Sequence, residues 1–202
     1  MSEAAPPGPG SPPESSEAFS LANHFLIAMP GMADPSFSGT VVFLCEHSSR
    51  GALGVVINRP TDLTLQTLFE RVELKFEDEP RSSEPVLYGG PVHTDRGFVL
   101  HTQADAHYDS TLRVNDSVAL TMSRDVLEAV AEGDGPPKLL VTLGHAGWGE
   151  GQLEYEIGRN AWLTVPADLS VIFDTPAQQR FGAAMHLLGI DPAMLSDQAG
   201  HA

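Results

Sequence analysis

Three adjacent residues, Cys45, Glu46 and His47, are the first candidates for chemistry in this sequence. They end an apolar run typical of a β-strand, and strand alternation places Cys45 and His47 on one face and Glu46 on the other. A charged histidine near a cysteine can lower the thiol pKa and create a reactive thiolate. Free cysteines are also among the most buried residues in proteins. Cys45 and His47 are therefore candidate catalytic residues, with an inert core thiol as the favoured alternative.

Histidine and aspartate side chains could instead hold a metal ion, but their spacing does not support such a site. The candidates share only their residue types, and they are His47, His93, His101, His107 and His145 with Asp95 or Asp105. No pair has the HExxH or H-x₃₋₅-H spacing on a helix.

The chain also lacks the G-x-S-x-G motif of serine hydrolases, and Ser123 is better interpreted as a helix cap. We expect neither a metal ion nor a cofactor.

Two glycine clusters mark a candidate binding cleft. Gly89-Gly90-Pro91 follows a short strand ending at Tyr88, and Gly144–Gly149 follows an apolar strand expected at 139–143. Loops after neighbouring strands can meet at one edge of a sheet, where ligands often bind when the strands are parallel. The predicted cleft comprises Tyr88, Gly89, Gly90, Pro91, Arg96, Gly144, His145, Gly147, Trp148, Gly149 and Trp162. In the alternative, the glycines serve tight turns and the tryptophans belong to the core.

Phosphate binding is not favoured at the second glycine cluster, although it lies between a strand and a helix. GHAGWG matches neither G-x-G-x-x-G nor G-x-x-x-x-G-K-[ST], and it contains no lysine or arginine. The helix that follows is expected to begin near Gly149 and to bury Leu153, Ile157 and Ala161. Glu156 and Arg159 are expected to form one favourable pair, whereas Glu150 and Glu154 are a like-charge pair.

Short strands and helices without strict alternation must position these residues. Strands are expected at 24–29, 40–47, 52–58, 85–88, 97–102, 117–122, 139–143 and 168–173, with one more before Pro166. Helices are expected at 63–72 with Thr64 as cap, from Ser123 to Gly133, after Gly149, and from Thr175-Pro176 to Gly189. About eight strands and four helices, with a hairpin at 40–58, predict a mixed sheet of the α+β class.

Composition limits the classes of function. Residues 1–18 are rich in Pro, Gly, Ser and Glu and are expected to form a disordered tail before a single domain at 19–202. The net charge is −16, and removing the three glutamates of the tail still leaves −13, so we expect no direct binding to nucleic acid. One cysteine allows no intrachain disulfide, and neither a secretory signal nor a membrane-spanning run is visible. We expect a cytoplasmic protein.

Several longer segments carry a family resemblance, and together they span nearly everything after residue 20. They are HFLIAMPGMADPSFSGTVVFLCEH at 24–47, GALGVVINRP at 51–60, GGPVHTDRGFVLHT at 89–102, SRDVLEA at 123–129, LGHAGWGEGQLEYEIGRNAWLTVPADLSVIF at 143–173 and the terminal AGHA. In these segments the chain resembles the bacterial YqgE/AlgH family. The resemblance implies one domain with a strongly bent mixed sheet, a partial barrel, and helices outside it. Members often carry tyrosine at the position of His145, which argues against an indispensable role for this histidine.

Two hypotheses of function remain open. The resemblance brings no established reaction or cofactor, and some family members are labelled as transcriptional regulators. We favour a non-catalytic regulatory or interaction protein that binds an unknown protein or small-molecule partner in its glycine-rich cleft. The alternative is an unrecognised enzyme that uses Cys45 and His47 or a bound metal ion.

Overall fold

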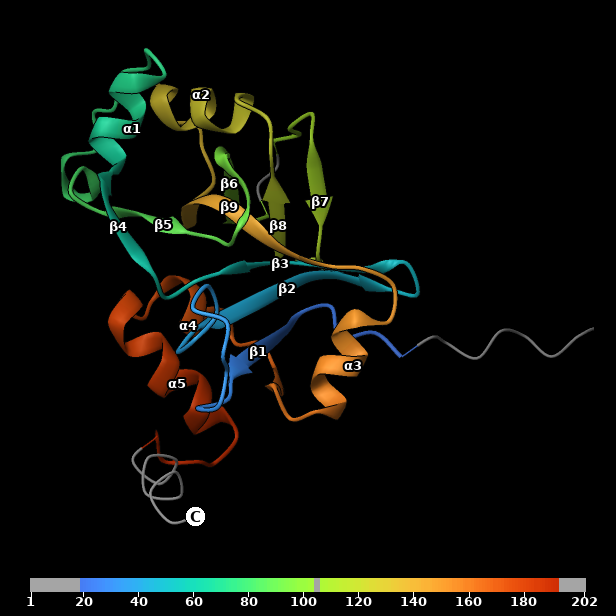
Figure 1. The fold of residues 1–202 in the computed structure, drawn as a ribbon. Coiled ribbons are helices and arrows are strands. Elements are labelled where there is room, and N and C mark those ends of the chain that lie inside the picture. Colours follow the sequence, from blue (N-terminus) through green and yellow to red (C-terminus); the bar gives the residue numbers. More distant parts are fainter. Residues whose placement is uncertain (1–18, 104–105, 193–202) are drawn as a thin grey trace, which may run out of the picture.

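The computed structural model describes residues 19–103 and 106–192, and its centre is one ten-stranded sheet (Figure 1). Residues 1–18, Asp105 and the terminal AGHA, on which some of the sequence predictions fall, lie outside the described residues. The strands are β1 (His24–Ala28), β2 (Val41–Ser48), β3 (Gly51–Val56), β4 (Pro60–Thr64), β5 (Pro85–Tyr88), β6 (Val92–Thr102), β7 (Thr111–Arg113), β8 (Val118–Thr121), β9 (Leu139–Trp148) and β10 (Trp162–Pro166). Strand order is β10-β1-β2-β3-β9-β6-β8-β7, while β5 pairs with both β9 and β4.

In the described residues, five α-helices and two 3-10 helices accompany the sheet. They are α1 (Leu65–Arg71), α2 (Asp125–Glu132), α3 (Gln152–Gly158), α4 (Leu169–Phe173) and α5 (Arg180–Leu187), with η1 (Glu79–Arg81) and η2 (Ala177–Gln179). The pair β5–β9 is parallel and the other strand pairs are antiparallel. The predicted fold class, an α+β protein with a strongly bent mixed sheet, is therefore confirmed.

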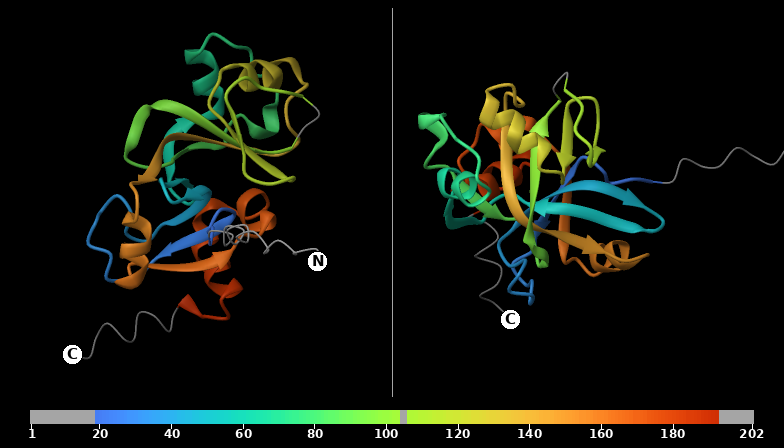
Figure 2. Two further views of the ribbon diagram at one scale, coloured as in Figure 1. Left: turned by 90° about the vertical axis from the view of Figure 1, so that its right-hand side faces the viewer. Right: turned by 90° about the horizontal axis from the view of Figure 1, so that it is seen from above.

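The curled sheet has an upper and a lower half (Figure 2, left). The upper half contains β4–β8 with α1 and α2, and the lower half contains β1, β2 and β10 with α3, α4 and α5. Strand β9 serves both, because residues 139–145 pair with β5 and β6 and residues 146–148 pair with β3. The two halves are therefore parts of one continuous sheet.

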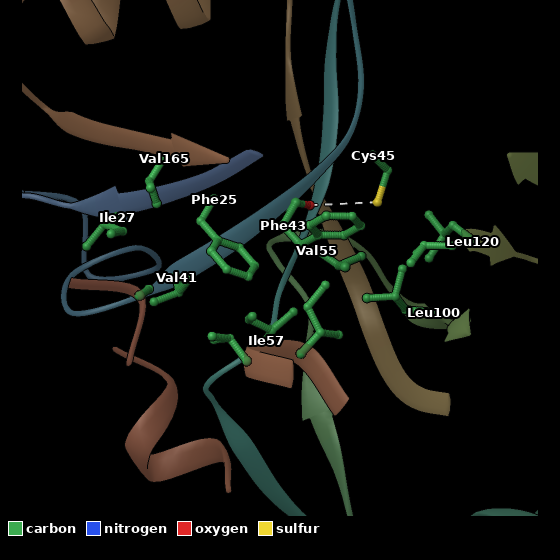
Figure 3. Packing of buried hydrophobic residues seen from close by; sticks show 14 of the residues in the cluster. Phe25, Ile27, Val41, Phe43, Cys45, Val55, Ile57, Leu100, Leu120 and Val165 are labelled. Atoms are coloured by element: carbon green, nitrogen blue, oxygen red, sulfur yellow. Dashed lines mark hydrogen bonds between the residues drawn. The ribbon is translucent and has the colours of Figure 1, made fainter. Parts of the chain in front are cut away.

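Alternation along the strands divides the core into three clusters. Phe25 and Ile27 of β1 belong to the cluster inside the curl, which α4 and α5 close (Figure 3). Leu26 and Ala28 point to the other face, where α3 covers a second cluster. A third cluster lies between the outer face of β6 and β9 and the helices α1 and α2. A sheet that is buried on both faces explains why its strands read as nearly continuous apolar runs.

Several local predictions are confirmed. Thr64 caps α1, because its side chain accepts a hydrogen bond from the main chain of Thr67. Gly133 ends α2 in the left-handed conformation, with φ of +84°. The strands β2 and β3 form the expected hairpin.

Other local predictions are wrong. Residues 168–173 were expected to form a strand, but Leu169–Phe173 form helix α4, because the Asp168 side chain accepts a hydrogen bond from the Ser170 main chain and caps the helix. A short apolar run of this length fits a buried helix as well as a strand. Ser123 does not cap α2, since its hydroxyl donates to Asp125 instead. Strands β4 and β7 were not expected, and they bring the total to ten strands.

The segment predicted as a glycine loop is largely strand. β9 continues through Gly144 and Gly147 to Trp148, and only Gly149 lies in the turn before α3. Glycine interrupts the apolar pattern of a strand without ending it, and interior glycines often mark places where another backbone approaches closely.

Candidate functional site

The two glycine clusters meet, and their main chains are in contact. A Cβ atom at Gly89 would lie 2.2 Å from the Gly144 carbonyl oxygen, and one at Gly90 would lie 2.3 Å from the His145 carbonyl. Gly90 and Gly144 have φ of +147° and +76°, which side chains disfavour. We call Gly89, Gly90, Gly144 and His145 the glycine junction. Main-chain atoms fill it, and a role in ligand binding stays a prediction.

Both tryptophans lie in the lower half and pack against each other. Their ring centroids are 6.0 Å apart, and Phe37 contacts both rings at 6.1 and 5.5 Å. Trp148 and Trp162 are 6% and 3% exposed. Glu156 Oε2 accepts both indole N–H groups, at 2.9 and 2.8 Å. We call these four residues the indole cluster, and it is a core element whose two polar groups share one carboxylate.

The first residue of α3, Gln152, is bonded to the same carboxylate. Glu156 Oε1 accepts from Gln152, and Gln152 Oε1 accepts from the main chain of Gly149. The predicted Glu156–Arg159 pair is replaced by these bonds, and the Arg159 guanidinium lies over the Tyr155 ring instead.

The other members of the predicted cleft lie in separate places. Tyr88 contacts the Arg59 guanidinium, 5.9 Å from the ring centroid. Arg96 and Pro91 are exposed at β6 and just before it. Gly147 lies beside the His145 ring. The structure thus divides the predicted cleft into two separate groups. The glycine clusters contact each other, and the two tryptophans contact each other elsewhere.

Cys45 is enclosed in the cluster inside the curl. Its Sγ atom lies 3.7 Å from the Phe43 carbonyl oxygen, to which the thiol donates (Figure 3). The residue is 2% exposed, and burial, together with the charge of Glu46, raises the pKa of the thiol far above its usual value. These surroundings stabilise the neutral thiol, which is a poor nucleophile.

His47 does not share a face with Cys45, so this part of the sequence prediction is wrong. A bulge between Leu44 and Glu46 inserts Cys45 as an extra residue and reverses the alternation after it. His47 Nδ1 accepts from the Leu21 main chain at 2.9 Å, so Nε2 carries the proton and donates to Glu154 at 2.8 Å. Both partners belong to the α3 side of the sheet, whereas Cys45 belongs to the inner cluster.

Glu154 and His101 also have shifted pKa values. The main-chain N–H of Glu154 and then the His47 ring donate to its carboxylate and lower the Glu154 pKa. His101 is buried between Thr102 and Thr121, and burial lowers the pKa of its imidazole. The carbonyl of Thr102 is an acceptor, so Nδ1 of His101 carries the proton.

Among residues 19–103 and 106–192, no three His, Cys, Asp or Glu side chains are grouped as metal ligands.

A cavity of about 450 Å³ lies between the two halves of the molecule. Its upper wall comes from the starts of β5 and β9, and its lower wall comes from residues 173–178, which run from the end of α4 into η2. We call it the seam cavity. It adjoins the amino ends of the parallel pair β5–β9, whereas the glycine junction follows the carboxyl end of β5.

Arg180 is the unusual residue of the seam cavity. It is 5% exposed, its Nε donates to the Thr175 carbonyl at 2.9 Å, and its Nη1 donates to the Ile57 carbonyl. Burial lowers the Arg180 pKa to about 10, and the nearby charge of Glu84 opposes this shift. Sequence reasoning missed Arg180, although it stands four residues before Ala184 on the buried face of α5.

The remaining charges around the seam cavity are paired. Lys138 Nζ binds both carboxylate oxygens of Asp174, at 2.5 and 2.8 Å, and joins the two halves across the rim. Arg81 Nε lies 3.6 Å from Glu84 Oε1.

In the described part of the chain, no helix is long and apolar enough to cross a membrane.

Comparisons with known proteins identify the family. The AlgH-like family model matches residues 25–193. A UPF0301 protein of Burkholderia vietnamiensis is 61% identical over 188 residues, which cover 93% of this chain and 98% of the relative. One from Ralstonia nicotianae is 63% identical over 182 residues, covering 90% and 95%.

Solved structures agree with this assignment. The solution structure of the AlgH protein from Pseudomonas aeruginosa has a TM-score of 0.75 and 47% identity, with 94% of this chain and all of that chain covered. A Corynebacterium diphtheriae protein, with a TM-score of 0.65, 22% identity and 85% and 89% coverage, shares the fold. The resemblance found in the sequence is confirmed, and the chain belongs to the AlgH-like family, UPF0301.

Proposed function

We propose that this protein is a non-catalytic binding protein that takes a small-molecule or protein partner where the two halves of its sheet meet. The observation that carries the proposal is the seam cavity, about 450 Å³ in volume and lined by both halves. Ligand sites are typically concave, mainly apolar and equipped with a few polar groups. The apolar walls, together with Arg180, have this composition.

The chemistry of the candidate catalytic residues supports a non-catalytic role. Cys45 is buried with a raised thiol pKa, and the bulge in β2 places His47 on the other face of the sheet. His47 already has partners at both ring nitrogens. A cysteine-dependent mechanism would need the thiolate beside its base.

The glycine junction supports the seam cavity from a distance. It holds the end of β5 against β9 through main-chain contact, and Gly89 donates to the Leu143 carbonyl at 2.8 Å. Both strands form the upper wall of the cavity through Leu87 and Leu140. We therefore propose that the predicted glycine-rich site positions the walls of the binding site.

We further propose a regulatory role in the cytoplasm without direct contact with nucleic acid. The net charge of −16 opposes binding to phosphate backbones. A single buried free thiol is compatible with a reducing compartment. Regulation would then act through the bound partner.

Retention of small molecules tests the binding function. Purified protein is dialysed against a metabolite extract, and the retained compounds are identified by mass spectrometry after denaturation. The Ala177→Trp variant places a large ring in the seam cavity, whereas Thr94→Trp, in the exposed first half of β6, leaves it open. We expect wild type and the Thr94 variant to retain a compound that the Ala177 variant loses. Equal retention by all three proteins, or none by wild type, would contradict a small-molecule site in this cavity.

A further inference from the structure

We propose that the seam cavity binds a small organic monocarboxylate whose carboxylate group pairs with Arg180. The inference rests on the binding function proposed above and specifies the ligand class. It starts from a charged group that the fold buries without a direct ion pair, although the charge of Glu84 is near enough to favour its charged form. Arg180 is 5% exposed and lines the cavity, and within the described chain it forms no ion pair.

The guanidinium has one nitrogen to spare. Nε and Nη1 donate to the carbonyls of Thr175 and Ile57, while Nη2 has no hydrogen-bond partner among the residues that the structure describes. A buried charge without a counter-ion is costly, because it has lost its hydration. A planar guanidinium matches a carboxylate in shape and hydrogen-bonding pattern. An anion in the cavity would supply the missing partner.

The surrounding charges favour a single negative charge. Lys138 is already paired with Asp174, and Arg81 is already close to Glu84. Among the described residues of the lining, Arg180 therefore contributes the one positive charge without an ion pair. Glu84 and Asp174 would also repel an incoming anion, and this repulsion grows with the charge of the ligand. A monocarboxylate is thus preferred over a phosphate dianion.

The walls of the cavity favour an apolar body on that ligand. The apolar lining includes Pro85, Leu87, Leu139, Leu140, Phe173 and Pro176. Burying hydrocarbon against such walls is favourable in proportion to the area removed from water. The ligand class is therefore a small carboxylic acid with an aromatic or aliphatic group, of which benzoate is a convenient probe.

Arg180 also has a structural role, so the test must follow ligand binding and not stability alone. Its bond to the Ile57 carbonyl connects the residue just after β3 to the start of α5, and its bond to the Thr175 carbonyl holds the turn before α5. Arg59 makes the same kind of contact elsewhere, donating to the carbonyls of Pro35, Ser36 and Ser38. Arg59 does not line the seam cavity. Arg59→Lys is therefore the matched control for Arg180→Lys.

The experiment is a titration of the full ¹⁵N-labelled chain, followed by NMR. Benzoate, neutral benzamide, inorganic phosphate and chloride are added at constant ionic strength. We expect saturable shifts of the Arg180 Nε–H and of the Leu140 and Gln178 amides with benzoate, with a Kd of about 1 mM for so small a ligand. Neutral benzamide should bind at least roughly tenfold more weakly than benzoate. Arg180→Lys should weaken benzoate at least about fivefold, whereas Arg59→Lys should not change it.

The cavity-filling variant keeps the test decisive if Arg180→Lys does not fold. Ala177→Trp leaves Arg180 in place and should abolish the benzoate shifts. The proposal is overturned if benzoate causes no saturable shift at the cavity, or if Ala177→Trp leaves the shifts intact. Equal shifts with phosphate and chloride mean an adventitious ion only, and they overturn it too. Retention of a neutral metabolite without benzoate binding refutes the carboxylate class but not the binding function. Failure of both experiments refutes both.

Discussion

Replacing Glu156 tests whether one carboxylate holds the indole cluster together. Its Oε2 accepts the N–H groups of Trp148 and Trp162, and its Oε1 accepts from Gln152. Glu156→Ala removes all three bonds and leaves two indole donors in a largely buried setting. Glu156→Gln keeps one oxygen that can still accept both indoles, but its amide group would meet the amide of Gln152.

The expected magnitude follows from the number and type of these bonds. A hydrogen bond to a charged group contributes about 1.5–3 kcal/mol net, and two such bonds join Glu156 to the indoles. Glu156 is half-buried and lines a second cavity of about 670 Å³, so water can satisfy part of the demand. We therefore expect Glu156→Ala to lower the free energy of unfolding by about 2–4 kcal/mol, and Glu156→Gln by about 1 kcal/mol.

Chemical denaturation followed by tryptophan fluorescence measures both values. The chain contains two tryptophans, and both belong to the indole cluster, so the signal reports on the perturbed region. Glu150→Gln, which changes an exposed carboxylate just before α3, is the control for the change in net charge. A loss below about 0.5 kcal/mol for Glu156→Ala, or equal losses for the Ala and Gln variants, would refute the reasoning.

Four further outcomes are expected. Gly90→Ala should lower the free energy of unfolding, measured by urea denaturation, by at least about 2 kcal/mol, because the new Cβ would lie 2.3 Å from the His145 carbonyl. The control Gly97→Ala, whose Cβ would enter open space, should change it by less than about 0.5 kcal/mol. Similar losses for the two variants would disprove the tight glycine junction. Cys45 should not react with a thiol reagent at neutral pH until the protein is denatured. Rapid reaction of the native protein would contradict the burial of this thiol. Asp168→Ala should cost about 1 kcal/mol at pH 7. Hydrogen bonds from the Ser170 side chain and main chain lower the folded Asp168 pKa below 3.8, so this contribution is present above that value and fades as pH falls through the folded pKa; a pH-independent difference between wild type and variant would be inconsistent with the cap. Purified protein should not shift duplex DNA at submicromolar concentration near physiological salt, and a specific, salt-sensitive shift would overturn this expectation.

The sequence predicts the class of fold because most elements carry their own local signals. Thr64 and Gly133 mark helix ends through side-chain capping and a left-handed conformation. The apolar strands predict a sheet buried on both faces. Asp168 shows where such signals fail, since a five-residue apolar helix and a buried strand have similar compositions, and only the cap distinguishes them.

The candidate site was harder to predict because it depends on contacts between distant segments. The glycine clusters could be expected to meet, since the sequence predicts that each follows an apolar strand of the same sheet, although the second cluster lies within β9. That His47 lies on the opposite face from Cys45 could not be predicted, because the bulge at Cys45 is not visible in the residue pattern. Arg180 gains its role from Ile57 and Thr175, and a basic residue that begins a helix normally indicates exposure.

The pairing of β1 with β10 has a consequence for synthesis of the chain on the ribosome. One edge of β1 pairs early with β2, but on the other edge His24 lies opposite Pro166, so this edge stays open until a partner 142 positions later is synthesised. Translation at about 5–20 residues per second makes this wait roughly 7–28 seconds. Strand β9, which pairs with β3, β5 and β6, is also completed late, at Trp148. The nascent chain therefore carries apolar strands with open edges for most of its synthesis, and we expect it to depend on chaperones more than its size suggests.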